Sequence, residues 1–540
     1  MAIPWKTAPV LTDAGMMLRA LYRLPGYLRH PLTLPECRTI LRQRLEQRES
    51  NWLDLVRRAI WTNAASPYRP LLHQAGCEPG DLERLARQDG LEGALQALLR
   101  AGVYLTVDEF KGRRPAVRGS AAIAVDHRQL RNPLSVPTLW AATSGSGGAA
   151  TRIQFGMACV RDHAVNMALT LAARGGAGWR SAVWVARGLI PVLWYSALGG
   201  PPARWFMQAD PRTCGLRSQL WWSIRMITTT SWLAGRPIHF PEHVPVDAPL
   251  PIARWIDSTL RAGEVPHLWT APSAAVRLCR AAEEAGIGLA GARLTLTGEP
   301  ITPARLAAIC RAQVDALPDY GTVDSGGSMT GGCLSPAAPD DVHLFSDLNA
   351  LIQGAGPPFP PRALFVSSLR PTTPFILLNV SMGDSATMAE RRCGCPLEAL
   401  GWRTHLHTIR SYEKLTAGGV TFEDSEIVPL LEDLLPRSFG GGPADYQLVE
   451  DEDGEGRPQL CLLIDPAAGP IDPAAVAEAF LDAIGRSSEG KRCMADQWRQ
   501  AGLPRVERRS PQPTASGKIL HLVAAHTTLG GASATPGGPP

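Results

Sequence analysis

The sequence predicts an α/β fold, with a large sheet-and-helix N-terminal domain and a small α+β C-terminal domain. Its 540 residues are too many for one ordinary hydrophobic core, so more than one domain is expected. From Leu139 onward, strand-like apolar runs alternate with helical ones, which is typical of sheets covered by helices. After about Thr408 the runs become short and compact over roughly 110 residues, a normal size for a separate domain.

The N-terminal hundred residues are rich in helix formers. Apolar positions recur at helical spacing over residues 37–60 and 81–99, and this periodicity predicts helices there. We therefore expect residues 1–100 to form a helical cap on a large domain that continues through residues 101–410.

Alternating runs define the rest of the large domain. The pattern predicts strands at 181–186, 293–297 and 363–369 and helices at 273–285 and 302–313. Ser273, which follows Pro272, and Pro303, just inside the second helix, give both helix starts residues that are common at helix caps.

The C-terminal domain is expected over residues 411–524. The pattern predicts a strand at 419–422, a helix at 425–435, strands at 446–450 and 460–464, a helix at 473–484 and a strand at 505–508. Residues 525–540 are mostly Gly, Ala, Pro, Ser and Thr without periodicity, so we expect a disordered tail there.

The composition is that of a soluble globular protein, with 45% hydrophobic and 19% charged residues. A net charge of +4, with basic residues scattered among the acidic ones, gives no nucleic-acid-binding pattern.

The most apolar stretch, 181–200, is interrupted by Arg187 and Pro191, so no membrane span is expected. Residues 1–35 do not resemble a signal peptide, and the 11 cysteines are mostly isolated, so we expect a cytoplasmic protein with reduced thiols.

A loop rich in glycine and hydroxyl groups is the first segment that points to chemistry. Residues 143–151 hold four hydroxyl side chains and three glycines, a composition that lets backbone N–H groups approach a phosphate closely. The loop lacks the Gly-Lys-Ser/Thr ending of a mononucleotide P-loop, and such a segment taken alone is more often a flexible polar turn.

Three further segments follow in order. The predicted strand 293–297 leads to residues 298–300, and residues 316–320 lead to Gly321, so two strand ends face the kind of crevice where α/β proteins bind ligands. The pair Gly383-Asp384 comes next, although alone such a pair is usually a turn. The last segment, 513–519, contains Lys518, which by itself would be interpreted as a solvated surface lysine.

The fixed order of these segments resembles the adenylate-forming enzymes, and within them the phenylacetate-CoA ligase branch, over residues 66–522. The resemblance implies that Tyr320 stacks on adenine and that Asp384 binds the ribose hydroxyls. It implies that Lys518 is catalytic and neutralises charge between carboxylate and α-phosphate, and that Asp324, also catalytic, binds Mg2+. The implied nucleotide-binding set is Thr143, Ser144, Gly145, Ser146, Gly147, Gly148, Thr151, Gly298, Glu299, Pro300, Asp319, Tyr320, Gly321, Thr322, Asp384 and Arg410.

The chain departs from the family's pattern at several positions. Ala149 and Ala150 stand where the family has a lysine and a proline, so a positive charge facing the phosphates is missing. Asp324 replaces a glutamate and still offers a hard oxygen ligand on a side chain one methylene shorter. Tyr412 follows Arg410 by two residues at the hinge position, where an acid is customary.

A separate group of thiols and an imidazole indicates a candidate zinc site. Cys333, His343, Cys393 and Cys395 offer enough donors for a closed tetrahedral structural site. Some phenylacetate-CoA ligase relatives carry a similar set. The spacing lies outside common zinc-finger patterns, and scattered cytosolic thiols are an equally good interpretation.

The resemblance implies an AMP-forming acid–thiol ligase of the acyl-CoA synthetase type. Such an enzyme would use ATP and Mg2+ to activate a carboxylic acid, here of the aryl type, as an acyl-adenylate, and would then transfer the acyl group to coenzyme A. Aromatic residues between 194 and 232 are candidates for a pocket wall, although aromatic side chains more often fill cores. Three alternatives stay open: transfer to a carrier protein or an amine, nucleotide binding with little catalysis, and a zinc-stabilised scaffold.

Overall fold

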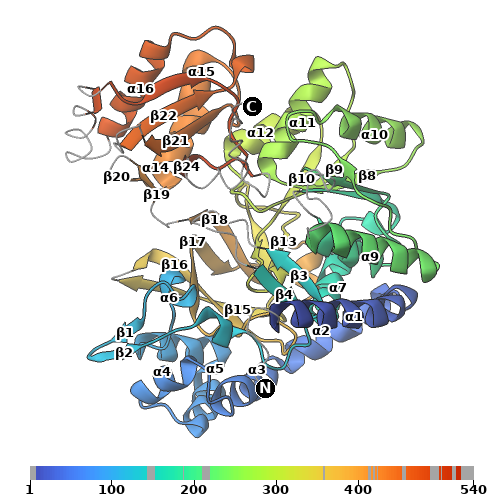
Figure 1. The fold of residues 1–540 in the computed structure, drawn as a ribbon, viewed down its shortest axis with the longest axis vertical. Helices are drawn as coiled ribbons and strands as arrows, with labels where there is room; N and C mark the ends of the chain where they lie inside the picture. The colour runs from blue at the N-terminus through green and yellow to red at the C-terminus, as the bar shows by residue number, and fades with distance from the viewer. Residues whose placement is uncertain are drawn as a thin grey trace, which may run out of the picture.

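A computed structural model of the protein describes most of the chain and confirms the predicted α/β class. The described residues are 8–142, 152–185, 188–208, 219–356, 359–411, 415–417, 420–422, 424–452, 458–486, 495, 498–499, 502–513 and 518–524. Two six-stranded sheets and a four-stranded sheet organise these residues (Figure 1). The predicted tail, residues 525–540, lies outside the described residues.

Helices form the N-terminal part, as the periodicity predicts. They are α1 (Ala8–Arg29), α2 (Leu34–Glu46), α3 (Arg48–Val56), a π-helical turn (Arg57–Trp61), α4 (Tyr68–Gln74), α5 (Pro79–Arg100) and α6 (Val107–Phe110). The predicted helix 37–60 is divided at Gln47, whose non-helical backbone ends α2 and starts α3. Helix α2 packs on α7 (Met157–Ala173) and α5 packs on β15 (Asn349–Gly356), so these helices share one core with the strands that follow.

The first large sheet is parallel throughout and has the strand order β10-β9-β8-β5-β6-β7. Its strands are β5 (Arg180–Val185), β6 (Arg204–Met207), β7 (Glu242–His243), β8 (Pro266–Thr270), β9 (Arg293–Thr297) and β10 (Asp315–Asp319). Helices α8 (Leu189–Ser196), α9 (Gln219–Leu233), α10 (Leu250–Arg261), α11 (Pro272–Glu284) and α12 (Pro303–Arg311) connect or cover them. The predicted strands 181–186 and 293–297 correspond to β5 and β9.

The two predicted helix starts have different outcomes. Thr302 caps α12, because its hydroxyl accepts a hydrogen bond from the Arg305 N–H at 3.2 Å and Pro303 occupies the first turn. Helix α11 has no such cap, since Ala271 occupies the cap position and offers no side-chain acceptor. The prediction for Ser273 is therefore wrong: its N–H and hydroxyl donate to the Glu299 carboxylate instead.

The second large sheet is antiparallel and has the order β13-β14-β18-β17-β16-β15. Its remaining strands are β13 (Thr330–Gly332), β14 (Val342–Leu344), β16 (Phe359–Ser368), β17 (Val380–Glu390) and β18 (Thr404–Ser411). Strand β16 takes the place of the predicted strand 363–369. The short α13 (Pro396–Ala399) follows β17.

Smaller elements complete both parts of the described chain. Four two-stranded pairs are β1 (Ala116–Arg118) with β2 (Ala121–Ile123), β3 (Leu139–Ala142) with β4 (Arg152–Phe155), β11 (Gly321–Thr322) with β12 (Gly327–Ser328), and β19 (Leu415–Ala417) with β20 (Val420–Phe422). Short 3-10 turns lie at His127–Leu130, Gly176–Gly178 and Pro466–Ala468.

The C-terminal part has its own sheet, with the order β23-β22-β21-β24, and its own core. The elements are α14 (Asp424–Pro429), a π-helical turn (Leu430–Leu434), α15 (Leu435–Phe439), β21 (Tyr446–Glu452), β22 (Pro458–Ile464), α16 (Pro473–Gly485), β23 (Arg505–Arg508) and β24 (Leu522–Ala524). Sequence reasoning missed β24, which pairs in parallel with β21. The predicted division between residues 410 and 411 stays a prediction.

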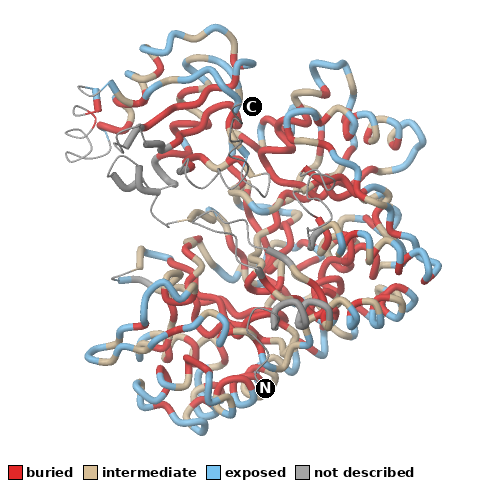
Figure 2. The backbone as a smooth tube through the Cα atoms, in the orientation of Figure 1, coloured by how far each residue is buried: buried red, intermediate tan, exposed pale blue. Residues whose placement is uncertain are grey.

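Buried residues run through the sheets, while exposed positions lie on the outer helices and in the connecting loops (Figure 2). The C-terminal part lies beside α11 and α12, at the edge of the first sheet (Figure 1). Ala444 joins the core under that sheet, and the turn Leu430–Leu434 packs on α12. Within the described residues, no helix combines the length and apolar character needed to cross a membrane.

Candidate nucleotide and acid site

The site is built where the parallel neighbours β9 and β10 end. Thr297 and Asp319 are register partners, and the Thr297 hydroxyl donates to Asp319 Oδ2 at 2.9 Å. The Ser328 hydroxyl donates to the other carboxylate oxygen. Burial raises the pKa of Asp319 to about 7, although both hydrogen bonds lower it. These strand ends therefore carry a buried carboxyl group poised between its charged and neutral forms.

Gly298, the residue after β9, lies against the predicted catalytic lysine. Its backbone has a φ of +83°, a conformation that residues with a Cβ rarely adopt. An ideal Cβ added at Gly298 would lie 3.0 Å from Lys518 Cε and 3.3 Å from Lys518 Nζ. Burial lowers the pKa of Lys518, while Glu299 and Asp384 raise it. The lysine therefore reaches the end of β9, between the carboxylates predicted for the nucleotide site.

Glu299 uses its carboxylate to join protein segments. Oε1 accepts from the Ser273 hydroxyl at 2.8 Å and from the Ile519 N–H at 3.0 Å. Oε2 accepts from the Ser273 N–H at 3.0 Å and from Arg305 Nη1 at 2.9 Å. The side chain is only 1% exposed. The side chain of Glu299, a residue of the implied nucleotide-binding set, is thus used to connect protein segments.

Tyr320 and Asp384 meet across two sheets. The Tyr320 hydroxyl donates to Asp384 Oδ2 at 2.8 Å, and the Tyr320 N–H donates to Thr330 Oγ1 at 2.7 Å. Gly321 follows with no room for a side chain, because a Cβ there would lie 2.2 Å from the Gly327 carbonyl oxygen. The aromatic ring and the acid predicted to bind adenine and ribose are therefore neighbours.

Asp324 forms an ion pair that the sequence did not suggest. Lys111, at the end of α6, lies 2.9 Å and 3.1 Å from the two carboxylate oxygens. The Asp324 side chain is buried, so the ammonium group compensates a charge that would otherwise be costly. The prediction that Asp324 binds Mg2+ stays a prediction.

Arg410 lies on the strand next to Asp384, but its side chain forms an ion pair with Asp340. It is the register partner of Ser385, the residue after Asp384, on neighbouring strands β17 and β18. Its Nη1 lies 3.1 Å from Asp340 Oδ2 and donates to the Ile409 carbonyl at 2.6 Å. Any contact between Arg410 and a nucleotide would have to replace or extend this pairing.

The predicted site residues fall into three groups. The first group lies together at the site and consists of Gly298, Glu299, Asp384 and Lys518, with Asp319 and Tyr320 at the adjacent strand end. Pro300 follows, and its carbonyl accepts from Arg305 at 3.4 Å. Thr322 instead supports the β11–β12 turn by accepting from the Ser325 N–H. Thr143, Ser144, Gly145, Ser146, Gly147, Gly148, Thr151 and the predicted pivot Tyr412 lie outside the described residues.

A small apolar cavity of about 30 Å³ adjoins Asp319. Trp194, Trp269 and Phe345 are among its walls, with His163 at one side. Burial lowers the pKa of His163 to about 4, so its ring is neutral, and its Nδ1 donates to the Ser328 carbonyl at 2.9 Å. Of the aromatic residues predicted as candidates for a pocket wall, Trp194 lines this cavity, while Trp222 and Trp232 are exposed on α9.

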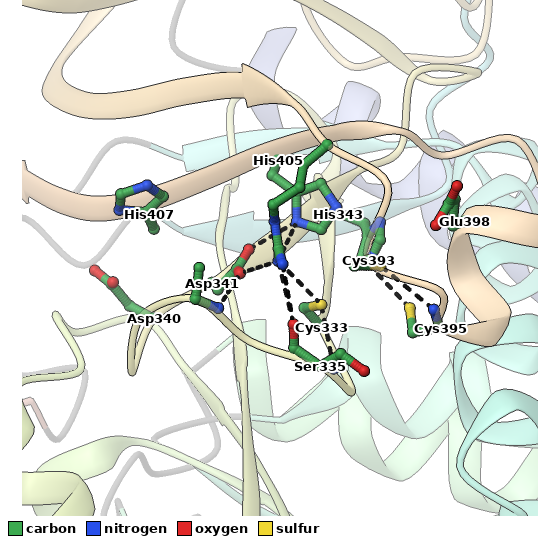
Figure 3. Close-up of polar contacts among 12 residues, drawn as sticks. Cys333, Ser335, Asp340, Asp341, His343, Cys393, Cys395, Glu398, His405 and His407 are labelled. Carbon is green, nitrogen blue, oxygen red and sulfur yellow. Dashed lines mark hydrogen bonds and ion pairs between the residues drawn. The ribbon is translucent and has the colours of Figure 1, made fainter.

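The four predicted zinc ligands gather at one end of the antiparallel sheet (Figure 3). His343 Nδ1 donates to the Trp402 carbonyl at 2.7 Å, which leaves the Nε2 lone pair free to face the thiols. Cys395 Sγ lies 3.2 Å and Cys393 Sγ 3.6 Å from that nitrogen.

His405 is an additional member of this cluster that the sequence reasoning missed. It is the register partner of His343 on β18, and its Nδ1 donates to Asp341 Oδ1 at 2.8 Å. Its Nε2 is buried and has no hydrogen-bond partner. One donor atom from each of Cys333, His343, Cys393 and His405 lies within 4.8 Å of the other three. The alternation His405-Leu406-His407 could have suggested a strand ligand, and Figure 3 shows His407 lying apart from the cluster.

The sequence matches no protein-family model and no curated protein. Among solved structures, the chain is similar to 2-hydroxyisobutyryl-CoA ligase in complex with 2-HIB-AMP and CoA, with 17% identity and a TM-score of 0.47 over 89% of this chain and 90% of that one.

Two further similar structures have lower scores. An anthranilate CoA ligase in complex with anthranoyl-AMP shows 12% identity and a TM-score of 0.40 over 70% of this chain and 65% of that one. O-succinylbenzoate coenzyme A synthetase from Bacillus subtilis, with ATP and magnesium, shows 15% identity and a TM-score of 0.40 over 75% and 72%. At these levels of likeness, the activity of this chain has to be argued from its own residues.

Proposed function

We propose that this protein activates a carboxylic acid with ATP and transfers the acyl group to a thiol. In the first step a carboxylate oxygen forms a bond to the α-phosphorus of ATP, and the bond to the bridging oxygen breaks to release pyrophosphate. In the second step the sulfur of coenzyme A bonds to the acyl carbon, AMP leaves with the bonding electron pair, and the thiol proton passes to solvent. Each step is balanced without an oxidant or reductant.

One juxtaposition carries the proposal: Lys518 lies against Gly298 while Tyr320 and Asp384 are hydrogen-bonded at the adjacent strand end. A cation at this point would neutralise the negative charge that develops between a carboxylate and the α-phosphate. The pair Tyr320 and Asp384 offers a ring face for a base and carboxylate oxygens for ribose hydroxyls. The carboxyl ends of parallel strands are also where α/β proteins commonly bind nucleotides.

Mg2+ would accompany ATP and screen the phosphate charge. Asp324 supplies carboxylate oxygens, the ligand type that Mg2+ prefers, and Lys111 already holds this side chain in place. The predicted loop 143–151 would add backbone N–H donors to the phosphates.

The acid is proposed to be of the aryl type. Trp194, Trp269 and Phe345 present aromatic walls next to Asp319, and flat apolar groups pack well against such walls. A bound ring would require these walls to move apart, because a cavity that holds benzene has a volume of about 150 Å³.

The C-terminal part, residues 411–524, is proposed to act as a lid. Rotation about Tyr412 would withdraw Lys518 after the first step and admit the thiol, a hinge motion of a kind that often limits turnover.

The test is acid-dependent exchange of pyrophosphate into ATP, measured over a panel of aryl and fatty acids. We expect at least one aryl acid to support exchange, and we expect the Lys518→Ala variant to lose it. If ATP binds but no acid supports exchange, the ligase proposal is wrong and the protein is a nucleotide-binding relative with little catalysis.

The acceptor is tested separately with an active acid. We expect release of AMP and formation of a thioester that both require coenzyme A. Equal product formation with an amine or a carrier-protein thiol, in the absence of coenzyme A, would favour that alternative acceptor.

We also propose a structural zinc ion, because His405 adds an unpartnered buried nitrogen to the predicted thiols. Zinc would cross-link β14, β18 and the turns after β13 and β17. Cys333, His343 and Cys393 would supply three ligands, and Cys395 or His405 the fourth. Metal analysis should find about one zinc per chain, and comparison of Cys395→Ala with His405→Ala should identify the fourth ligand.

A further inference from the structure

A buried network of charges links the large part of the chain to the segment that carries Lys518. Its centre is Arg305 on α12, whose side chain is 1% exposed. Arg305 Nη1 lies 2.9 Å from Glu299 Oε2, and Arg305 Nε lies 2.7 Å from Glu432 Oε1. Glu299 follows β9 of the first sheet, whereas Glu432 belongs to the C-terminal part, so one guanidinium group pairs with acids from both parts.

Glu432 has three partners and almost no contact with solvent. Its side chain is 2% exposed, and it accepts a hydrogen bond from the Thr302 hydroxyl. His521 Nε2 lies 2.6 Å from Glu432 Oε1 and must donate, because a carboxylate only accepts. Burial would raise the pKa of Glu432, but Arg305 and His521 together lower it. Glu432 is therefore a buried anion held by three donors.

The residues after Lys518 are fixed one after another. The Ile519 N–H donates to Glu299 at 3.0 Å, and the Leu520 carbonyl accepts from Gln447 at 2.8 Å. His521 bonds to Glu432 through its ring, and its carbonyl accepts from the Leu448 N–H at 2.8 Å. Strand β24 begins at the next residue. The backbone that carries the lysine is thus held by both Glu299 and Glu432.

Acids and cations alternate in this network. Arg305 lies between Glu299 and Glu432, and Lys518 is close to both Glu299 and Asp384. Removing the charge of Glu432 would leave Arg305 with one of its two buried partners, which is more costly than losing an exposed ion pair. The network is therefore sensitive to a change of one charge.

We infer that Glu432, Arg305 and His521 are positioning residues that hold the C-terminal part in the orientation where Lys518 enters the site. This inference rests on the proposed function for its catalytic consequence, because only the first step needs the lysine at that place. The network acts through the backbone that carries Lys518. Glu432, Arg305 and His521 contact neither the carboxylate of the acid nor the α-phosphate in this proposal. The network should therefore support formation of the acyl-adenylate and be dispensable for thiol transfer.

The first experiment separates the two steps in the Glu432→Gln variant, which keeps the size of the side chain and removes its charge. We expect kcat for acid-dependent pyrophosphate exchange to fall by about 10- to 100-fold, because a small displacement of a catalytic group has effects of that order. Thioester formation from acyl-adenylate supplied to the enzyme should stay within about threefold of the wild type, because that step does not use the lysine.

The matched control is Asp433→Asn, one residue away in the same turn. Asp433 pairs with Arg437 on the surface, where its side chain is 46% exposed, so both steps should be unchanged. His521→Gln is a second variant that removes a single partner of Glu432, and it should show a weaker form of the same split if Glu432→Gln folds poorly.

The second experiment is independent of activity. Acetylation of lysines in the whole protein is followed by mass spectrometry, and Lys518 should react several times faster in Glu432→Gln than in the wild type or Asp433→Asn. Unchanged reactivity of Lys518, or equal loss of both steps in the variant, overturns the inference. If the wild type shows no exchange with any acid while the difference in Lys518 reactivity persists, the proposed function fails and the network stands.

Discussion

The Cys/His cluster and the Lys518 site are held together in different ways. The cluster belongs to one antiparallel sheet, where the ladder between β14 and β18 sets His343 opposite His405. The Lys518 site draws on two sheets and on the C-terminal part, and ion pairs around Arg305 hold its pieces. The cluster therefore needs only its own sheet to fold, whereas the lysine site also needs correct docking of the C-terminal part.

Among changes at these two sites, Lys518→Ala is expected to have the largest effect. Pyrophosphate exchange should fall by about 100- to 1,000-fold, the loss typical when a preorganised charge is removed from a transition state. The free energy of unfolding should fall as well, because the change takes a buried cation from beside Glu299 and Asp384, so exchange is measured at a temperature where both proteins are folded. Arg505→Ala, an exposed change on β23, is the control. Full exchange activity in Lys518→Ala would remove the lysine from the mechanism.

A second effect concerns the carboxyl at the end of β10. The pKa of Asp319 is raised by burial from 3.8 to about 7, so the folded protein holds this proton more tightly than the unfolded chain. The stabilisation is fully present below about pH 4 and is lost as the pH rises through about 7. At about 1.36 kcal/mol per pKa unit, the upper bound is about 4 kcal/mol.

The measurement is urea unfolding of the wild type and of Asp319→Asn at pH 4.5 and at pH 8. The free energy of unfolding of the wild type should decline with pH more steeply than that of the variant, which cannot ionise at this position. Parallel pH profiles for the two proteins would show that Asp319 keeps an ordinary pKa.

Breaking the cluster should lower stability without touching the first chemical step. Cys393→Ala is expected to release the proposed zinc ion and to reduce the free energy of unfolding by about 2–4 kcal/mol, since an ion that binds only the folded state stabilises it by mass action. Cys310→Ala, which changes an exposed thiol, is the control. Unaltered metal content in Cys393→Ala would exclude this thiol as a ligand.

The smallest expected effect is that of Tyr320→Phe. The change removes one hydrogen bond to Asp384 and keeps the ring, so the cost in stability should be about 1 kcal/mol. In exchange assays KM for ATP should rise a few-fold while kcat stays within about twofold, because the ring that would stack on adenine remains. A collapse of kcat instead would assign the hydroxyl a part in the chemistry.

The sequence predicted local elements better than it predicted partners. Strands β9 and β23 match the predicted ranges: β9 alternates polar and apolar residues as a strand does, and β23 begins directly after the break at Pro504. The predicted helix 425–435 is instead three successive helical pieces, α14, a π-helical turn and α15, and no periodicity signals such a transition. Strand β24 was missed because three residues give too short a pattern.

Long-range pairing explains what was missed at the site. Lys111 meets Asp324 across 213 positions, and Arg305 meets His521 across 216, so neither pair leaves a signal in local spacing. His405 was missed for a related reason, since its register with His343 depends on how β14 and β18 pair. The residues predicted at strand ends do have predicted partners as neighbours, since Gly298 lies against Lys518 and Tyr320 contacts Asp384, while their roles stay predictions.

Under the proposed function, Gly298 limits which substitutions leave this protein active. A single nucleotide change that gives this position any side chain would crowd the lysine's terminal carbon and force a strained backbone at the same time. A descendant could then be inert in acid activation while it retained every acid, tyrosine and lysine by which the chemistry is recognised. A search for the reactive residues alone would count such a protein as active. Only the loss of glycine at position 298 would show that it is not.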